Sequence, residues 1–114
     1  MTIKKSEIAG LGLFANRAII ADEKIYYDVP DMTYEEYIKI RNGLSRKESE
    51  LFLTTEDRVY DIRNSELRYM NHSKTPNISW EDGLYITALR NIKIDEELTI
   101  DYNWTEEEER EFLF

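Results

Sequence analysis

The spacing of apolar residues divides the chain into strand-like flanks and a helical middle. Residues 2–28 contain short apolar runs broken by glycines and polar turns, which is typical of strands joined by turns. From residue 58 onward, the pattern again favours strands. The predicted strands there are VYDI (59–62), NISW (77–80), the alternating LYITAL (84–89), with a hairpin turn at 81–83, and a pair within RNIKIDEELTIDY (90–102) that turns at Asp95-Glu96.

The middle of the chain predicts two helices. Thr33 with Glu36, and Ser45 with Glu48, each have the spacing of a capping box, in which a side chain at either end bonds the backbone of the other. Asn42-Gly43 separates the two patterns. The predicted helices span 34–41 and 46–53.

The order of these elements predicts an α+β fold that is mainly β, formed by a single domain over residues 1–114. Residues 33–53 are a helical insert, and residues 105–114 are a C-terminal tail. Capping-box spacing from Thr105 to Glu108 predicts a short helix in that tail. The apolar end of the tail, Phe112–Phe114, is expected to dock on the body of the domain.

Composition excludes several kinds of chemistry. The 114 residues include no cysteine and one histidine, so a Cys/His zinc site and a cysteine nucleophile are excluded, and no metal site is expected. A net charge of −9 argues against nucleic acid and fits a Lys/Arg-rich partner, although solubility alone explains the charge equally well. No apolar run is long enough to span a bilayer and no signal-like stretch is present, so an intracellular protein without membrane contact is expected.

Three short motifs are candidates for chemistry, and each has a plainer explanation. GLGLF (10–14) lets the backbone approach a ligand, but a simple turn accounts for it, and the third glycine of a dinucleotide site is missing. In NHS (71–73), the amide of Asn71 can hold a zwitterionic ligand, or the motif is a polar turn with a structural histidine. EELTIDYNW (96–104) is either a half-buried strand or a strand that brings Tyr102 into a cleft.

Together and in this order, GLGLFA, RYMNHSKTPN and EELTIDY resemble the three signature blocks of the SET-domain protein lysine methyltransferases. The resemblance extends from about residue 10 to residue 104, and its second and third blocks are specific. It implies the SET-domain (β-clip) fold, in which several small curled sheets surround a knot-like crossing of the C-terminal segment. The short chain is similar to the minimal viral and bacterial type, which lacks pre-SET and post-SET zinc modules.

The resemblance also implies a cofactor, S-adenosyl-L-methionine (SAM), and residues that contact it. The backbone around Leu11 and Gly12 would lie along SAM. The side chain of Asn71 and the backbone of His72 would hold its methionine end and adenine. Trp104, or a C-terminal phenylalanine, would cover the adenine.

For the reaction, the resemblance implies that Tyr102 is the catalytic residue and stands where SAM meets the target lysine. Trp80 matches a position that lines the lysine channel, where a bulky ring would limit the number of methyl groups. Asp28 falls where many members have a channel tyrosine. Tyr27, one residue earlier, is the candidate taken here for the channel, and the partner of Tyr102 stays open.

The implied activity is SAM-dependent methylation of a lysine in a basic, histone-like or ribosomal protein. No catalytic base is needed, because a nearby sulfonium and a desolvated channel both lower the pKa of the amine. The alternative is a catalytically weak SET-like module that binds basic peptides. A homodimer through the terminal FLF is a further hypothesis. The compartment would be the cytoplasm of a bacterium, or the host nucleus for a viral or secreted protein.

Overall fold

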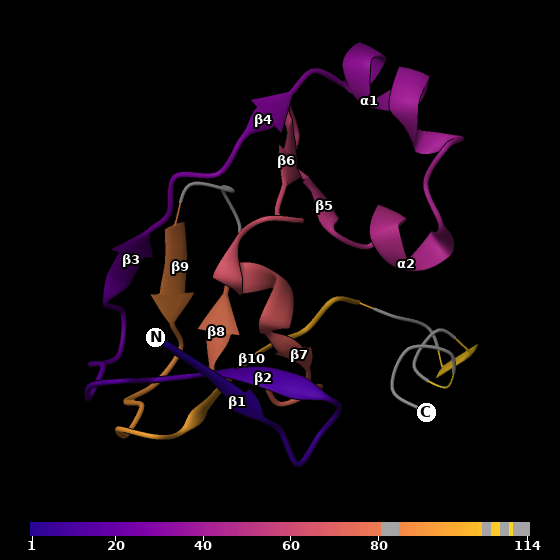
Figure 1. Ribbon diagram of the computed structural model, residues 1–114. Coiled ribbons are helices and arrows are strands. Elements are labelled where there is room, and N and C mark those ends of the chain that lie inside the picture. Colours follow the sequence, from indigo (N-terminus) through magenta and orange to yellow (C-terminus); the bar gives the residue numbers. More distant parts are fainter. Residues whose placement is uncertain (81–84, 104–105, 108–109, 111–114) are drawn as a thin grey trace.

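The computed structural model describes residues 1–80, 85–103, 106–107 and 110 (Figure 1). In this part of the chain, short strands form three small sheets, accompanied by two helices and one 3₁₀ helix. No helix in the described segments is both long and apolar enough to cross a membrane. The elements are β1 (Thr2–Lys5), β2 (Leu11–Phe14), β3 (Lys24–Tyr26), β4 (Asp31–Met32), α1 (Tyr34–Arg41), α2 (Arg46–Ser49), β5 (Phe52–Thr54), β6 (Val59–Asp61), η1 (Glu66–Tyr69), β7 (Asn71–His72), β8 (Ile78–Ser79), β9 (Tyr85–Ala88) and β10 (Glu97–Ile100).

The largest sheet combines two strands from the start of the chain with two strands from its second half. Its order is β1-β2-β10-β7, so β10 is a central strand. β10 runs antiparallel to β2, with Leu98 opposite Leu13, and parallel to β7, with Thr99 opposite Asn71. The other sheets are β3-β9-β8 and β4-β6-β5, and every pairing within them is antiparallel. The predicted mainly β, α+β class with several small sheets is confirmed.

The core lies between the sheets and is built from aliphatic side chains. Leu13 of β2, Leu98 of β10 and Ile86 of β9 are fully buried. Ile78 and Ile92, on either side of β9 in sequence, are 1% exposed. Burial of each such side chain contributes roughly 1.5–3 kcal/mol. Because residues from three sheets share one core, the sheets are held as one unit.

The helical insert has the predicted caps, but its second helix is shorter than predicted. Thr33 accepts a bond from the backbone N–H of Glu36, and Ser45 and Glu48 form a complete capping box. The prediction of a helix over 46–53 is wrong at its C-terminal half. Phe52 belongs to β5, where it is 6% exposed and pairs with Asp61 of β6. The strand conformation lets Phe52–Thr54 bond to β6 and buries the ring of Phe52. Figure 1 shows α1 and α2 beside the β4-β6-β5 sheet, away from β1 and β2.

The strand predictions in the second half are confirmed in part. β8 and β9 pair antiparallel, as the hairpin prediction requires, and their connection lies outside the described residues. The predicted strand pair within 90–102 is wrong. Ile92 forms an isolated bridge with Ile19, and the partners of β10 are β2 and β7. The turn lies at Asp95, which has a positive φ of 67°. Of the predicted helix at 105–114, Glu106, Glu107 and Arg110 are described and helical, whereas Phe112–Phe114 lies outside the described residues.

Candidate functional site

Asn77 holds β10 against the segment that contains the NHS motif. Its side chain is 2% exposed and bonds the strand at two points. Nδ2 donates to the backbone oxygen of Glu97 at 2.8 Å, and Oδ1 accepts from the backbone N–H of Thr99 at 2.8 Å. Thr99 is buried as well, and its hydroxyl accepts a bond from the backbone N–H of Asn77 at 3.3 Å. Both faces of β10 are therefore buried, and the register of the strand is fixed relative to residues 71–77.

The same arrangement places Tyr102, which follows β10. The backbone N–H of Tyr102 donates to Nδ1 of His72 at 3.1 Å, and its hydroxyl donates to the backbone oxygen of Met70 at 2.8 Å. His72 is 4% exposed. The imidazole thus positions Tyr102, so the side chain of His72 has a role beside the backbone role that the resemblance implies.

The hydroxyl of Tyr102 is held in its neutral form. Burial raises the pKa of this hydroxyl, and the nearby negative charge of Glu50 raises the pKa further. A neutral hydroxyl can donate to Met70 and still offer its lone pairs to an incoming N–H group. Tyr102 can therefore orient an amine without acting as a base.

The raised pKa predicts a change in stability at high pH. In the unfolded chain the hydroxyl of Tyr102 ionises at about pH 10, whereas in the folded chain it ionises at a higher pH. The folded state therefore has its full stability below about pH 10 and loses stability as the pH rises above that value. Between neutral pH and about pH 11, the unfolding free energy of the wild type should fall by roughly 1 kcal/mol more than that of the Tyr102→Phe variant, which has no hydroxyl to ionise. Urea unfolding at both pH values measures this. Tyr26→Phe, at a residue that is 70% exposed, should behave like the wild type, and identical losses in all three proteins would contradict the prediction.

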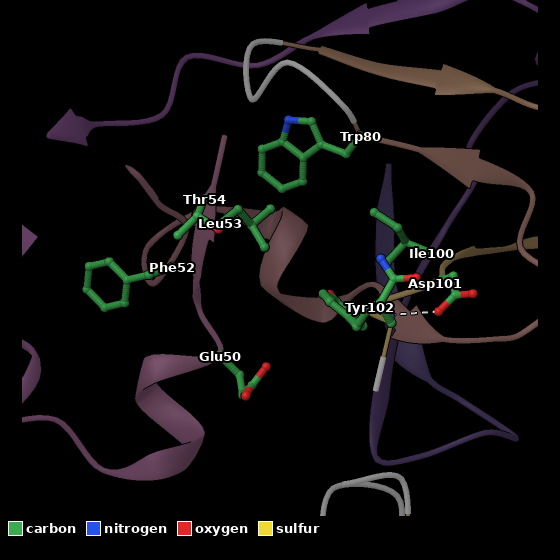
Figure 2. Close-up of a pocket in the computed structure, with 9 residues that line it drawn as sticks. Glu50, Phe52, Leu53, Thr54, Trp80, Ile100, Asp101 and Tyr102 are labelled. Atoms are coloured by element: carbon green, nitrogen blue, oxygen red, sulfur yellow. Dashed lines mark hydrogen bonds between the residues drawn. The ribbon is translucent and has the colours of Figure 1, made fainter. Parts of the chain in front are cut away.

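A cavity of about 310 Å³ adjoins Tyr102. The residues that line it come from three segments: the end of α2 with β5, the residue after β8, and the end of β10 (Figure 2). Trp80, Leu53 and Ile100 form apolar walls, and Glu50 and Asp101 supply carboxylates. The cavity can therefore admit a long aliphatic chain that ends in a cation. A second cavity of about 300 Å³ shares Trp80 and Ile100 with the first and is also lined by Pro76, Ile78 and Leu89.

The residues predicted to hold the cofactor also lie together. Nδ2 of Asn71 donates to the backbone oxygens of Ala9 and Leu11 at 3.1 and 3.2 Å and to Oε2 of Glu97 at 2.8 Å. Asn71 therefore holds the loop that leads into GLGLF. Gly12 is required there, because a Cβ at this position would lie 2.5 Å from Oε2 of Glu97.

Of the residues predicted for the lysine channel, Trp80 and Tyr102 line the cavity and Tyr27 does not. Tyr27 is absent from the side chains that line it, and its hydroxyl donates to Glu66 of η1 at 2.7 Å. Burial and the Glu66 carboxylate raise the pKa of Tyr27. Its role in the lysine channel stays a prediction that the cavity does not support. Trp104 lies outside the described residues.

Several residues of the site were not predicted. The contribution of β5 is not predicted, because the helix predicted over 46–53 includes its first two residues. Asn77 and Glu97 lie inside the second and third blocks, yet neither was given a role, because only the pairing of β10 reveals what they bond. The sequence offers one signal for Asn77. This residue follows Pro76, at the end of the polar turn, and stands at the start of the predicted strand 77–80. The missed residues are Ser6, Glu50, Phe52, Leu53, Thr54, Asn77 and Glu97.

Comparison with known families identifies the fold. Residues 10–103 match the SET domain. This range includes all three sequence blocks and the residues that line both cavities. The chain belongs to the SET domain family. The resemblance stated from the motifs is confirmed, and the fold of several small sheets is that of a SET domain.

Relatives of this SET domain are much longer proteins. It is 37% identical over 120 residues to a protein of Aspergillus oryzae named histone-lysine N-methyltransferase, H3 lysine-4 specific, covering 90% of this chain and 9% of the relative. A protein of the same name from Emericella nidulans is 38% identical over 110 residues, covering 87% of this chain and 9% of the relative. The chain therefore spans about a tenth of the length of the curated relatives that it matches.

Solved structures show the same fold. A humanized mutant of the Chaetomium thermophilum Polycomb Repressive Complex 2, bound to an inhibitor, matches with a TM-score of 0.68 and 25% identity over 88% of this SET domain and 14% of that chain. A crystal structure of the Chaetomium thermophilum complex matches with a TM-score of 0.64 and 24% identity, covering 88% and 15%. The arrangement of sheets around the site is thus that of larger SET-domain proteins.

Proposed function

We propose that this SET domain transfers a methyl group from SAM to the side-chain amine of a lysine in a protein substrate. The observation that carries the proposal is the position of Tyr102. Its hydroxyl is fixed at the backbone of Met70, between the cavity on one side and the Asn71-His72 segment on the other. The family and the names of the relatives, which are histone-lysine N-methyltransferases, support the same reaction.

The reaction needs the neutral amine, and the groups that line the cavity act on its pKa in opposite directions. A lysine ammonium has a pKa near about 10.4 in water and must lose its proton before it can attack. The carboxylates of Glu50 and Asp101 attract the charged form to the cavity. The same carboxylates raise the pKa of the bound amine, whereas the apolar walls at Trp80, Leu53 and Ile100 and the sulfonium of SAM would lower it.

Tyr102 aligns the amine once it is neutral. Because its hydroxyl donates to the Met70 oxygen, a lone pair of the hydroxyl is directed elsewhere and can accept from the amine N–H. The indole of Trp80 offers a π-face for an alkylammonium, worth about 0.5–1 kcal/mol at an exposed site and about 2 kcal/mol when desolvated. Holding the amine in line is the main contribution of the protein.

The proposed cofactor residues fit SAM in one specific respect. Both amide hydrogens of Asn71 are used within the chain, and no described residue donates to its Oδ1. An acceptor oxygen suits the α-ammonium group of the methionine end. SAM supplies an activated methyl group on a sulfonium, and the residues around Asn71 would bind its amino-acid end.

The proposed substrate is a basic protein. A net charge of −9 and the carboxylates at the cavity favour lysines that lie among other basic residues. Histones are the named substrates of the relatives, which makes them the first candidates for this chain. A homodimer that packs through the C-terminal FLF stays a prediction.

The experiment is incubation with methyl-labelled SAM and a panel of basic and acidic proteins. We expect label on lysines of basic proteins such as histones, and none on acidic proteins of equal lysine content. Mass spectrometry of the modified peptide measures the site. Tight binding of basic peptides without any SAM binding or transfer would contradict the proposal and favour the alternative, a module that only binds such peptides.

A further inference from the structure

A carboxylate lies at the centre of the proposed cofactor region and has no role in the chemistry described so far. Glu97, the first residue of β10, is partly buried. Ser6 donates its hydroxyl to this carboxylate, with oxygen distances of 2.7 and 2.8 Å. Asn71 donates to Oε2 at 2.8 Å. Ser6 is itself 9% exposed, so this contact is protected from water.

This carboxylate determines how the amide of Asn71 is turned. Nδ2 faces three acceptors: the backbone oxygens of Ala9 and Leu11 and the carboxylate of Glu97. A carboxylate can only accept hydrogen bonds, so a flipped amide would bring Oδ1 against three oxygens. The arrangement therefore leaves Oδ1 of Asn71 as the atom that can accept from a ligand.

Ser6 holds both the carboxylate and the loop that precedes GLGLF. While its hydroxyl donates to Glu97, its oxygen accepts from the backbone N–H of Ile8 at 2.9 Å. The same carboxylate lies against the backbone of Gly12, where a Cβ would be 2.5 Å from Oε2 and 3.0 Å from Cβ of Ser6. One carboxylate thus contacts both sequence blocks that are proposed to bind the amino-acid end of SAM.

We propose that Glu97, held by Ser6, is a positioning residue for the amino-acid end of the cofactor. It fixes Asn71 with Oδ1 directed to the ligand, where Oδ1 can accept from the α-ammonium group. The inference rests on the proposed function, because it names how that same site selects its ligand. It applies to any ligand with an α-amino-acid end and gives no advantage to a ligand without one.

The test compares ligands that differ only at that end. SAM and S-adenosylhomocysteine carry the α-amino acid, and 5′-methylthioadenosine lacks it. Calorimetry should show that Glu97→Gln weakens both amino-acid ligands about tenfold, which is about 1.4 kcal/mol, and leaves methylthioadenosine within about twofold of the wild type. Asp95→Asn is the matched control, since it also removes one negative charge, two residues before Glu97. The side chain of Asp95 is 74% exposed. Asparagine tolerates the positive φ of residue 95.

Two further variants separate positioning from a loss of folding. Ser6→Ala should weaken the amino-acid ligands by roughly threefold in the wild type and by less in the Glu97→Gln background, because Ser6 acts in part through the carboxylate. In an Asn71→Ala background, Glu97→Gln should have little further effect for the same reason. Thermal unfolding of each variant checks that the fold persists.

The failures of the two proposals are distinguishable. If the wild type binds SAM and Asn71→Ala weakens it, but Glu97→Gln behaves like Asp95→Asn, the positioning role is wrong and the proposed function stands. An equal loss of methylthioadenosine affinity in Glu97→Gln also overturns the positioning role, because it shows general damage. If the wild type binds none of the three ligands, the proposed function fails and this inference fails with it.

Discussion

Tyr102→Phe is expected to lower kcat for methyl transfer by at least about a hundredfold, with little change in the affinity for SAM. The substitution removes one oxygen and retains the ring at the cavity wall. It therefore removes the acceptor for the amine N–H and the bond to the Met70 oxygen at 2.8 Å. Loss of one well-placed hydrogen-bonding group in an active site costs about 10²–10³ in kcat, or roughly 2.7–4 kcal/mol.

The structure provides a matched control for this variant. Tyr34 also donates its hydroxyl to a backbone oxygen, that of Thr55 at 2.6 Å, but it lies on the helical insert and does not line the cavity. Tyr34→Phe should keep kcat within about twofold of the wild type, since it loses a similar bond outside the site. Single-turnover kinetics with labelled SAM measures the chemical step directly. Equal rates in Tyr102→Phe and Tyr34→Phe would remove Tyr102 from the mechanism.

Asn77→Ala is expected to have the largest effect on stability, about 3 kcal/mol of unfolding free energy. The side chain is 2% exposed, and its loss leaves two backbone groups of β10 without partners: the oxygen of Glu97 and the N–H of Thr99. Each unsatisfied buried group costs about 1–3 kcal/mol. The loss also frees β10 from the NHS segment, so Tyr102 becomes less well positioned.

Urea unfolding followed by circular dichroism measures this effect. Asn16→Ala is the control, because Asn16 is exposed and makes no side-chain hydrogen bond within the described residues; it should change the free energy by less than about 0.5 kcal/mol. Asn77→Asp should also be destabilising, since Nδ2 becomes an acceptor that faces the Glu97 oxygen. An Asn77→Ala protein as stable as Asn16→Ala would show that the bonds to β10 do not hold the strand.

The sequence predicted local features well where one interaction determines them. The capping residues Thr33 and Ser45 place the starts of both helices correctly, because a cap depends on residues three positions apart. The order of GLGLF, NHS and EELTIDY predicted the family, which the match over residues 10–103 confirms.

Features that depend on distant partners could not be predicted in this way. Residues 52–54 fit a helical continuation or a strand equally well, and the pairing with β6 decides the outcome. The alternation in β10 predicted one buried face, whereas Thr99 is also buried because β7 and Asn77 cover it. The bonds of Glu97 with Ser6, 91 positions apart in sequence, have no local signal at all.

The central position of β10 has a consequence for how the domain forms during synthesis. β1 and β2 leave the ribosome first and can pair at once, but one edge of β2 stays open until residues 97–100 have been made. An open edge can pair with another chain, and contacts this distant in sequence form slowly. The nascent domain therefore passes through a period in which chaperones that cover β2 would protect it, and the site around Asn71 and Tyr102 assembles only at the end of that period.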